Sequence, residues 1–84
     1  MRQLNVDVEK VLPYKIFTMD RCVYCIRAKM LLNKHGIPFK EKHLIGEDLQ
    51  RFKNVTKFTT LPQIYDGNEN HIGGYDELYL QLEG

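Results

Sequence analysis

Both cysteines of this 84-residue chain lie in one short motif, Cys22-Val23-Tyr24-Cys25. Small domains that depend on disulfides for stability spread four or more cysteines along the chain, so that distant segments become joined. Two cysteines so close together cannot do this, and the fold must rest on an apolar core instead. A chain of this length forms one domain, residues 1–84, and buries about 60% of the surface that its unfolded form exposes. The cysteine pair is therefore a redox-active dithiol or one half of a metal site.

Composition and charge exclude several classes of protein. The formal net charge is +1, which gives no electrostatic reason to expect binding to nucleic acid or to an anionic membrane. Apolar residues make up 43% of the chain, as in globular domains, so disorder is not expected. Apolar runs such as residues 30–32 are far too short to span a bilayer, and residues 1–5 do not lead into a signal peptide. We therefore expect a cytoplasmic protein, in a compartment that keeps thiols reduced.

The pattern of apolar residues and chain breakers predicts alternating strands and helices after a stretch that is hard to place. Residues 1–13 form either an ordered N-terminal arm or a short extra strand. The expected strands are residues 14–18, 38–44, 63–65 and 70–72, and the expected helices begin at or near residues 22, 46 and 75. The order β-α-β-α-β-β-α predicts a parallel pair with a right-handed crossover, followed by an antiparallel hairpin. We therefore expect an α/β, thioredoxin-like fold, with a four-stranded mixed sheet flanked by three helices.

The sequence also predicts which faces of the first two helices are buried and where the first helix and the hairpin turn lie. The apolar face expected for the first helix consists of Tyr24, Cys25, Ala28, Leu31 and Leu32. This helix should end at His35-Gly36, where the glycine can adopt a left-handed conformation. The apolar stripe expected for the second helix consists of Leu49, Phe52 and Val55. Asp66-Gly67 favours a tight primed turn between the last two strands.

The position of the cysteine pair, between a strand and a helix, suits redox chemistry. Cys22 is expected at the helix N-terminus, where unpaired backbone N–H groups and the positive end of the helix dipole stabilise a thiolate. Such a position can lower the pKa of a thiol from about 8.5 toward about 3.5–7.5. Arg21 is adjacent, and Lys15 or Arg27 could add positive potential. Cys25, one turn along the same face, is expected to be more buried. Cys22 would then attack a disulfide, and Cys25 would release the product.

A zinc site is the main alternative on the motif alone. Zinc would need two further ligands, and the candidate histidines are His35, His43 and His71. His35 lies ten residues beyond Cys25 on the same expected helix. At 1.5 Å per residue this places it roughly 15 Å away, too far to bind the same ion. The chain has no second Cys-x-x-Cys motif. The pattern therefore favours redox chemistry, and we assign no metal ligands.

Four stretches of the chain form an ordered set of motifs. They are Ile16-Phe17-Thr18, Cys22-Val23-Tyr24-Cys25, Thr60-Leu61-Pro62-Gln63-Ile64 and His71-Ile72-Gly73-Gly74-Tyr75-Asp76. With this order and spacing, residues 14–82 resemble the glutaredoxin family, and most closely its compact phage-type members with a Cys-Val-Tyr-Cys site. One of these motifs alone would be weak evidence, whereas the ordered set is highly specific.

The resemblance implies roles for residues outside the cysteine pair. In the family, the proline that matches Pro62 has a cis peptide bond and faces the dithiol, so that the backbone of Leu61 could pair with an extended substrate. The corner of the family that matches Gly74, Tyr75 and Asp76 holds the γ-glutamyl end of glutathione, whose carboxylate suits a helix N-terminus. The other substrate- or glutathione-binding residues that the resemblance implies are Arg21, Tyr24 and Thr60. From the residues alone, the proline could instead open an edge strand and the aspartate could simply cap a helix.

Three positions depart from the family pattern. Val23 replaces the proline that usually separates the cysteines. Met19 stands where the family usually has a lysine that pairs with a carboxylate of glutathione. Phe58-Thr59 stands where a basic or polar partner usually precedes the Thr-x-Pro motif. Arg21 and Lys57 could compensate, so the affinity for glutathione is the inherited property that the sequence supports least.

The resemblance implies a glutathione-linked thiol–disulfide oxidoreductase that reduces protein disulfides and glutathione mixed disulfides. Glutathione would be a co-substrate, with no cofactor tightly bound. The expected partners are disulfide-containing proteins, with ribonucleotide reductase as one candidate, and the expected state is a monomer. Two alternatives stay open. One is a redoxin of the same fold that is recharged by thioredoxin reductase. The other is a non-enzymatic metal or iron–sulfur module, although cluster-binding members usually carry a Cys-Gly-Phe-Ser type of site, which this chain lacks.

Overall fold

The computed structural model describes residues 12–84. Most of the expected N-terminal arm or extra strand at residues 1–13 therefore lies outside the described residues. The helices and strands, in chain order, are β1 (Tyr14–Met19), α2 (Val23–Lys34), β2 (Phe39–Leu44), α3 (Gly46–Thr56), β3 (Gln63–Tyr65), β4 (His71–Gly73) and α4 (Tyr75–Glu83). This is the order that the sequence predicts, with boundaries that differ by no more than one residue.

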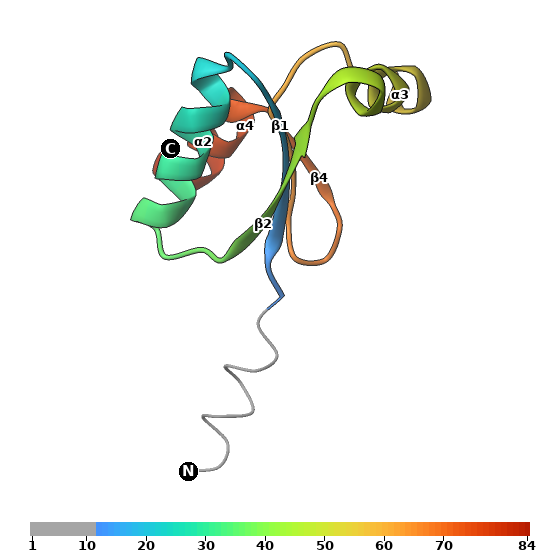
Figure 1. The fold of residues 1–84 in the computed structure, drawn as a ribbon. Coiled ribbons are helices and arrows are strands. Elements are labelled where there is room, and N and C mark those ends of the chain that lie inside the picture. The colour runs from blue at the N-terminus through green and yellow to red at the C-terminus, as the bar shows by residue number, and fades with distance from the viewer. Residues whose placement is uncertain (1–11) are drawn as a thin grey trace.

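The strands form one mixed sheet in the order β2-β1-β3-β4. β1 pairs with β2 in parallel, whereas β1 with β3 and β3 with β4 are antiparallel. Helices α2 and α4 cover one face of this sheet and α3 lies on the other side (Figure 1). The four-stranded mixed sheet flanked by three helices is therefore confirmed.

Two apolar clusters hold these layers together. The larger one joins the sheet to α2 and α4, and its buried members are Ile16, Ala28, Leu31, Leu32, Ile64 and Leu78. The smaller one consists of Cys22, Cys25, Leu44 and Leu61, with Leu49 and Phe52 of α3 packed against it. The dithiol is thus part of the packing between one end of the sheet and α3, which fixes its surroundings.

Two residues expected on buried helix faces are exposed. Tyr24 is 52% exposed, because the side chains of α2 that enter the core are those of Cys25, Ala28, Leu31 and Leu32. Val55 is 75% exposed, because the apolar residues of α3 that pack against the smaller cluster are Leu49 and Phe52. Tyr24 and Val55 therefore belong to the apolar helix faces predicted from the sequence but not to the buried core.

The turn between β3 and β4 is also different from the expected one. The predicted hairpin is present, but the residue with a left-handed backbone is Glu69, with φ of 67°, and not Gly67. One carboxylate oxygen of Asp66 accepts hydrogen bonds from the backbone N–H groups of Asn68 and Asn70, at 2.8 and 2.9 Å. The aspartate side chain therefore organises a longer loop, and a two-residue primed turn is not formed.

Candidate active site

Cys22 is the N-cap residue of α2, as the sequence predicts. Its backbone is extended, with φ of −118° and ψ of 98°, and its Sγ accepts a hydrogen bond from the Cys25 N–H at 3.1 Å. Arg21, with φ of 54°, turns the chain from the loop after β1 into the helix. The first turn of α2 carries no acidic side chain. An anionic sulfur at this position would therefore face helix N–H groups without a carboxylate from that turn to oppose it.

The two cysteines are joined in a disulfide, with their Cα atoms 5.2 Å apart. Cys22 is 8% exposed and Cys25 is 2% exposed. The order of burial is the one expected from the helix geometry, because the residue one turn inside the helix packs more deeply. A substrate can therefore approach the sulfur of Cys22 more easily than that of Cys25.

A loop before β3 covers the dithiol. The Leu61–Pro62 peptide bond is cis, as the resemblance implies for this position. The carbonyl oxygen of Leu61 lies 3.5 Å from Cys22 Sγ. The pairing of β1 with β3 ends at Gln63, so Leu61 lies beyond the ladder, beside the sulfur.

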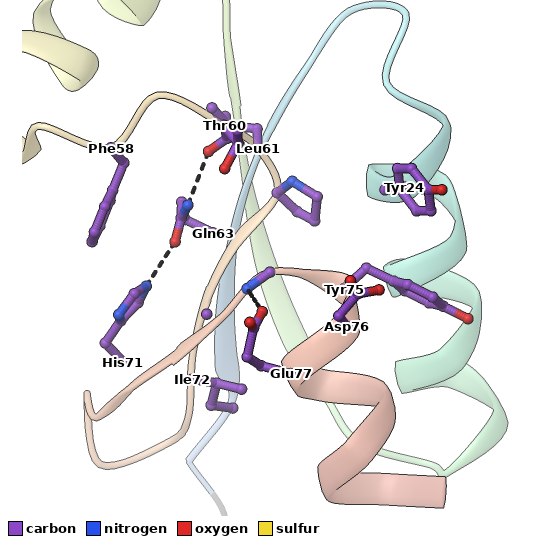
Figure 2. A pocket seen from close by; sticks show the side chains of 13 residues that line it. Tyr24, Phe58, Thr60, Leu61, Gln63, His71, Ile72, Tyr75, Asp76 and Glu77 are labelled. Atoms are coloured by element: carbon purple, nitrogen blue, oxygen red, sulfur yellow. Dashed lines mark hydrogen bonds between the residues drawn. The ribbon is translucent and has the colours of Figure 1, made fainter.

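A groove of about 550 Å³ begins at this loop and is shown in Figure 2. It runs between the loop, β4 and the N-terminus of α4, with Tyr24 of α2 at one side. It brings together the predicted site residues Tyr24, Thr60, Leu61, Pro62, Gly74, Tyr75 and Asp76. Arg21 is not among the lining residues and lies instead at a smaller cavity on the other side of the dithiol.

Two glycines, Gly73 and Gly74, precede α4 at the groove. The Gly74 N–H donates to Glu77 Oε1 at 2.8 Å. A Cβ atom on Gly74 would lie 3.4 Å from the carbonyl oxygen of Pro62, which is van der Waals contact with the loop. Gly73 has φ of 127°, a backbone conformation that residues with a side chain rarely adopt. The glycine pair therefore lets the helix terminus approach the groove closely.

Comparison with known proteins agrees with this geometry. The family model for glutaredoxin matches residues 15–72 of the chain. The chain belongs to the glutaredoxin family. It is 44% identical over 69 residues to a glutaredoxin from Pseudomonas aeruginosa, covering 80% of this chain and 81% of that protein. It is 40% identical to glutaredoxin 3 from Escherichia coli over 67 residues, covering 77% of this chain and 80% of that protein.

Solved structures give the same result for the fold. Glutaredoxin 1 from Francisella tularensis matches with a TM-score of 0.75 and 28% identity, covering 82% of this chain and 90% of that chain. A glutaredoxin from Brucella melitensis matches with a TM-score of 0.68 and 35% identity, covering 83% of this chain and 77% of that chain. The thioredoxin-like fold is therefore confirmed, and this glutaredoxin is a thiol–disulfide oxidoreductase. The nearer likeness to phage-type members stays a prediction.

The far end of the groove in this glutaredoxin is built from residues to which sequence reasoning gave no chemical role. The rings of Phe58 and His71 stack with centroids 4.6 Å apart and planes 18° apart. His71 Nε2 lies 2.7 Å from Gln63 Oε1, and Gln63 Nε2 donates to the Thr60 carbonyl at 2.9 Å (Figure 2). This chain of contacts ties β4 to the loop that covers the dithiol. His71 and Gln63 lie in the motifs quoted above, but the motifs do not show that their side chains meet.

Few cations surround the site. Among residues 12–84, those that line the groove include no lysine or arginine, and the acids Asp76 and Glu77 lie at one end. Lys15, which could have added positive potential, pairs instead with Glu69 at 2.8 Å. The guanidinium of Arg27 lies over the Tyr24 ring, 5.4 Å from its centroid. The fixed positive potential at the groove therefore comes mainly from helix N-termini.

Within the described part of the chain, no three His, Cys, Asp or Glu side chains come together in a group that could hold a metal ion. No helix among residues 12–84 combines the length and apolar character needed to cross a membrane.

Proposed function

We propose that this glutaredoxin reduces disulfides with Cys22 as nucleophile and Cys25 as resolving thiol, and that it binds glutathione in the groove beside Leu61. The observation that carries the proposal is the position of Cys22 Sγ. It lies at the N-cap of α2 and 3.5 Å from the carbonyl oxygen of a residue that lines the groove. One sulfur atom thus has both a helix terminus to stabilise its charge and a substrate groove next to it.

The reaction begins with the reduced protein. The Cys22 thiolate, stabilised by the Cys25 N–H and the terminus of α2, attacks one sulfur of a substrate disulfide. A bond forms between Cys22 Sγ and that sulfur, and the other substrate sulfur leaves as a thiolate. Cys25 then attacks Cys22 Sγ, which closes the Cys22–Cys25 disulfide and releases the second substrate thiol. Glutathione restores the dithiol by the same exchange in reverse.

The groove suits an extended peptide such as glutathione. We place the cysteine backbone of glutathione beside Leu61, which lies beyond the β1–β3 pairing and is free to form a short added strand. The γ-glutamyl carboxylate then lies at the N-terminus of α4, near Gly74 and Asp76, where the helix dipole favours an anion. Tyr24 flanks the bound peptide from α2, with Thr60 on the opposite side, and Arg21 lies outside this arrangement.

The proposed partners are glutathione and proteins with accessible disulfides, and ribonucleotide reductase is one candidate among them. The proposed compartment is the cytoplasm, where thiols are kept reduced. A redoxin recharged by thioredoxin reductase is the second candidate function. It is favoured by one observation, the lack of lysine and arginine among the described groove residues, which weakens the expected hold on the carboxylates of glutathione.

An assay of electron donors tests which function is correct. The oxidised protein is incubated with NADPH and either glutathione with glutathione reductase, or thioredoxin reductase. We expect protein thiols to be recovered faster with the glutathione system. Recovery with thioredoxin reductase alone would establish the second candidate.

Single cysteine variants test the two roles. Cys22→Ser should abolish all exchange, because no attacking thiolate remains. Cys25→Ser should lose the reduction of protein disulfides but keep activity on glutathione mixed disulfides, and it should trap protein substrates covalently. The assignment is wrong if Cys25→Ser is as inactive as Cys22→Ser on glutathione mixed disulfides.

A further inference from the structure

A second, smaller cavity lies on the side of the dithiol away from the groove. Its volume is about 200 Å³, and both Cys22 and Cys25 line it together with Thr18, Glu41 and His43. A water molecule occupies about 30 Å³ in the liquid, so the cavity has room for several. Cys25 is only 2% exposed, and this cavity places it next to polar side chains.

The polar side chains of the cavity form one continuous chain of contacts. The hydroxyl of Thr18, a residue that is 1% exposed, donates to Glu41 Oε2 at 2.6 Å. The same hydroxyl oxygen lies 2.9 Å from His43 Nδ1. His43 Nε2 lies 2.7 Å from Asp20 Oδ1. The chain thus runs from the loop after β1 through β2 to a buried residue of β1.

Each contact of His43 needs one hydrogen between its two heavy atoms. The Thr18 hydroxyl has one hydrogen, which it donates to Glu41, so the hydrogen between Thr18 and His43 must come from Nδ1. The carboxylate of Asp20 can only accept, so the hydrogen in that contact must come from Nε2. All three contacts are satisfied when both ring nitrogens of His43 carry hydrogen. Cys22 and Cys25 form a disulfide here, so neither sulfur carries a proton.

Carboxylates lie beside both ring nitrogens of His43. Asp20 contacts one ring nitrogen, and Glu41 Oε2 lies 3.8 Å from the other. Lys29 of α2 pairs with Glu41 at 3.0 Å, and Arg21 lines the same cavity. The hydrogen bond from Thr18, with help from Lys29, holds the pKa of Glu41 below its ordinary value. Glu41 therefore remains ionised at neutral pH and is a poorer proton acceptor than an imidazole.

We propose that His43 accepts the proton of Cys25, through water in this cavity, as Cys25 attacks the mixed disulfide at Cys22. The Cys25 S–H bond breaks and its proton passes to the imidazole. The Cys25 sulfur forms the bond to Cys22 Sγ, and the substrate sulfur leaves with the electron pair of the broken bond and takes a proton from solvent. The mixed disulfide is the oxidant, so no further reagent is needed. This inference rests on the proposed roles of the two cysteines.

The test separates the two thiol steps with an aromatic disulfide reagent. One equivalent of 5,5′-dithiobis(2-nitrobenzoic acid) is mixed with the reduced protein in a stopped-flow instrument. The first release of coloured thiol reports attack by Cys22, and the second reports attack by Cys25. For His43→Gln at pH 7 we expect the second phase to slow by about tenfold or more, and the first to change by less than about twofold. At pH 9.5 the defect should shrink to about twofold or less, because a thiol then ionises without help.

Matched variants keep the result interpretable. His35→Gln is the control variant. His35 is also exposed and also contacts a carboxylate, that of Glu83, but it lies at the C-terminal end of α2, away from the dithiol. This variant should leave both phases unchanged. Asp20→Asn weakens the contact to Nε2 and should slow the second phase by less than His43→Gln does. A second phase in His43→Gln that is normal at pH 7, or equally slow at every pH, overturns the proposal. A wild-type protein without a first phase would instead contradict the proposed function of Cys22.

Discussion

At the scale of single residues, the side chains around the dithiol are held in place by contacts that also affect stability. Glu41 shows this most directly, since the Thr18 hydroxyl donates to it at 2.6 Å and Lys29 Nζ lies 3.0 Å away. These contacts favour the ionised form and lower the pKa of Glu41 from its ordinary value of 4.5. A carboxyl group whose pKa is lower in the folded than in the unfolded state stabilises the fold above its unfolded pKa. That stabilisation is lost as the pH falls through the folded pKa.

Glu41→Gln should therefore flatten the acid side of the stability curve. We expect the variant to have a lower free energy of unfolding than the wild type at pH 7, because an ionised acceptor is replaced by a neutral one. Below the ordinary carboxyl value of 4.5 the two curves should converge, because the wild type loses its advantage as Glu41 becomes protonated. Urea denaturation at a series of pH values measures this. Parallel curves for the two proteins would show that the contacts of Glu41 do not favour its ionised form.

Replacing Gly73 by a residue with a side chain should lower the stability of the fold. Its φ is 127°, and a Cβ atom there would lie 2.8 Å from Glu77 Cγ, displacing the side chain that accepts from the Gly74 N–H. We expect Gly73→Ala to destabilise the protein by about 2–4 kcal/mol in urea denaturation. Gly36→Ala is the control, because Gly36 also has a positive φ, of 67°, but has nothing within 4 Å of an added Cβ. It should cost about 1–2 kcal/mol. Equal losses would mean that contact with Glu77 is unimportant.

At the scale of helices and strands, α4 connects the core to the groove. Its N-terminal residues line the groove, while Leu78, one turn further on, is fully buried against the sheet and α2. Leu78→Ala should therefore lower the free energy of unfolding by about 2–5 kcal/mol. Leu80→Ala removes the same atoms from an exposed position on the same helix and should change stability by less than about 0.5 kcal/mol. Thermal or urea unfolding of the two variants measures the difference. Similar losses in both would show that α4 is not anchored by its buried face.

The sequence predicted elements more reliably than contacts between them. Cys22 was correctly placed at a helix start, because a strand, a short loop and an apolar period of helical spacing leave few other positions for it. The contact of His71 with Gln63 was not predictable, because it depends on the register of a hairpin that carries an irregularity between Ile64 and Tyr65. Val55 was misplaced for a related reason. An apolar residue at helical spacing indicates a face, but the depth of packing depends on how far the helix overlaps the sheet.

At the scale of the whole molecule, the site lies where several chain segments end. The C-terminal ends of the parallel strands β1 and β2, the N-terminus of α2 and the loop before β3 all meet at the dithiol, and the N-terminus of α4 closes the groove next to it. Helix N-termini supply positive potential that falls off within about one turn. The net charge of +1 adds almost nothing at longer range.

This electrostatic arrangement predicts how salt affects the reaction. Long-range attraction between charged groups in water is screened over about 10 Å at 0.1 M salt. Because the described groove residues include Asp76 and Glu77 but no lysine or arginine, the wild type offers little long-range attraction for anionic glutathione disulfide. We expect its rate of reaction with glutathione disulfide to change by less than about twofold between low salt and about 0.5 M salt.

Met19→Lys should change that behaviour. Met19 is partly buried beside the cluster that contains Cys22 and Leu61, and a lysine there can keep its stem packed while its ammonium group reaches solvent. We expect the variant to react several times faster than the wild type at low salt and to lose this gain as salt is added, because the new attraction is screened. Stopped-flow reduction of glutathione disulfide over a salt series measures both proteins. A gain that persists at high salt would point to a direct contact with a carboxylate, and no gain at all would show that position 19 lies outside the reach of bound glutathione.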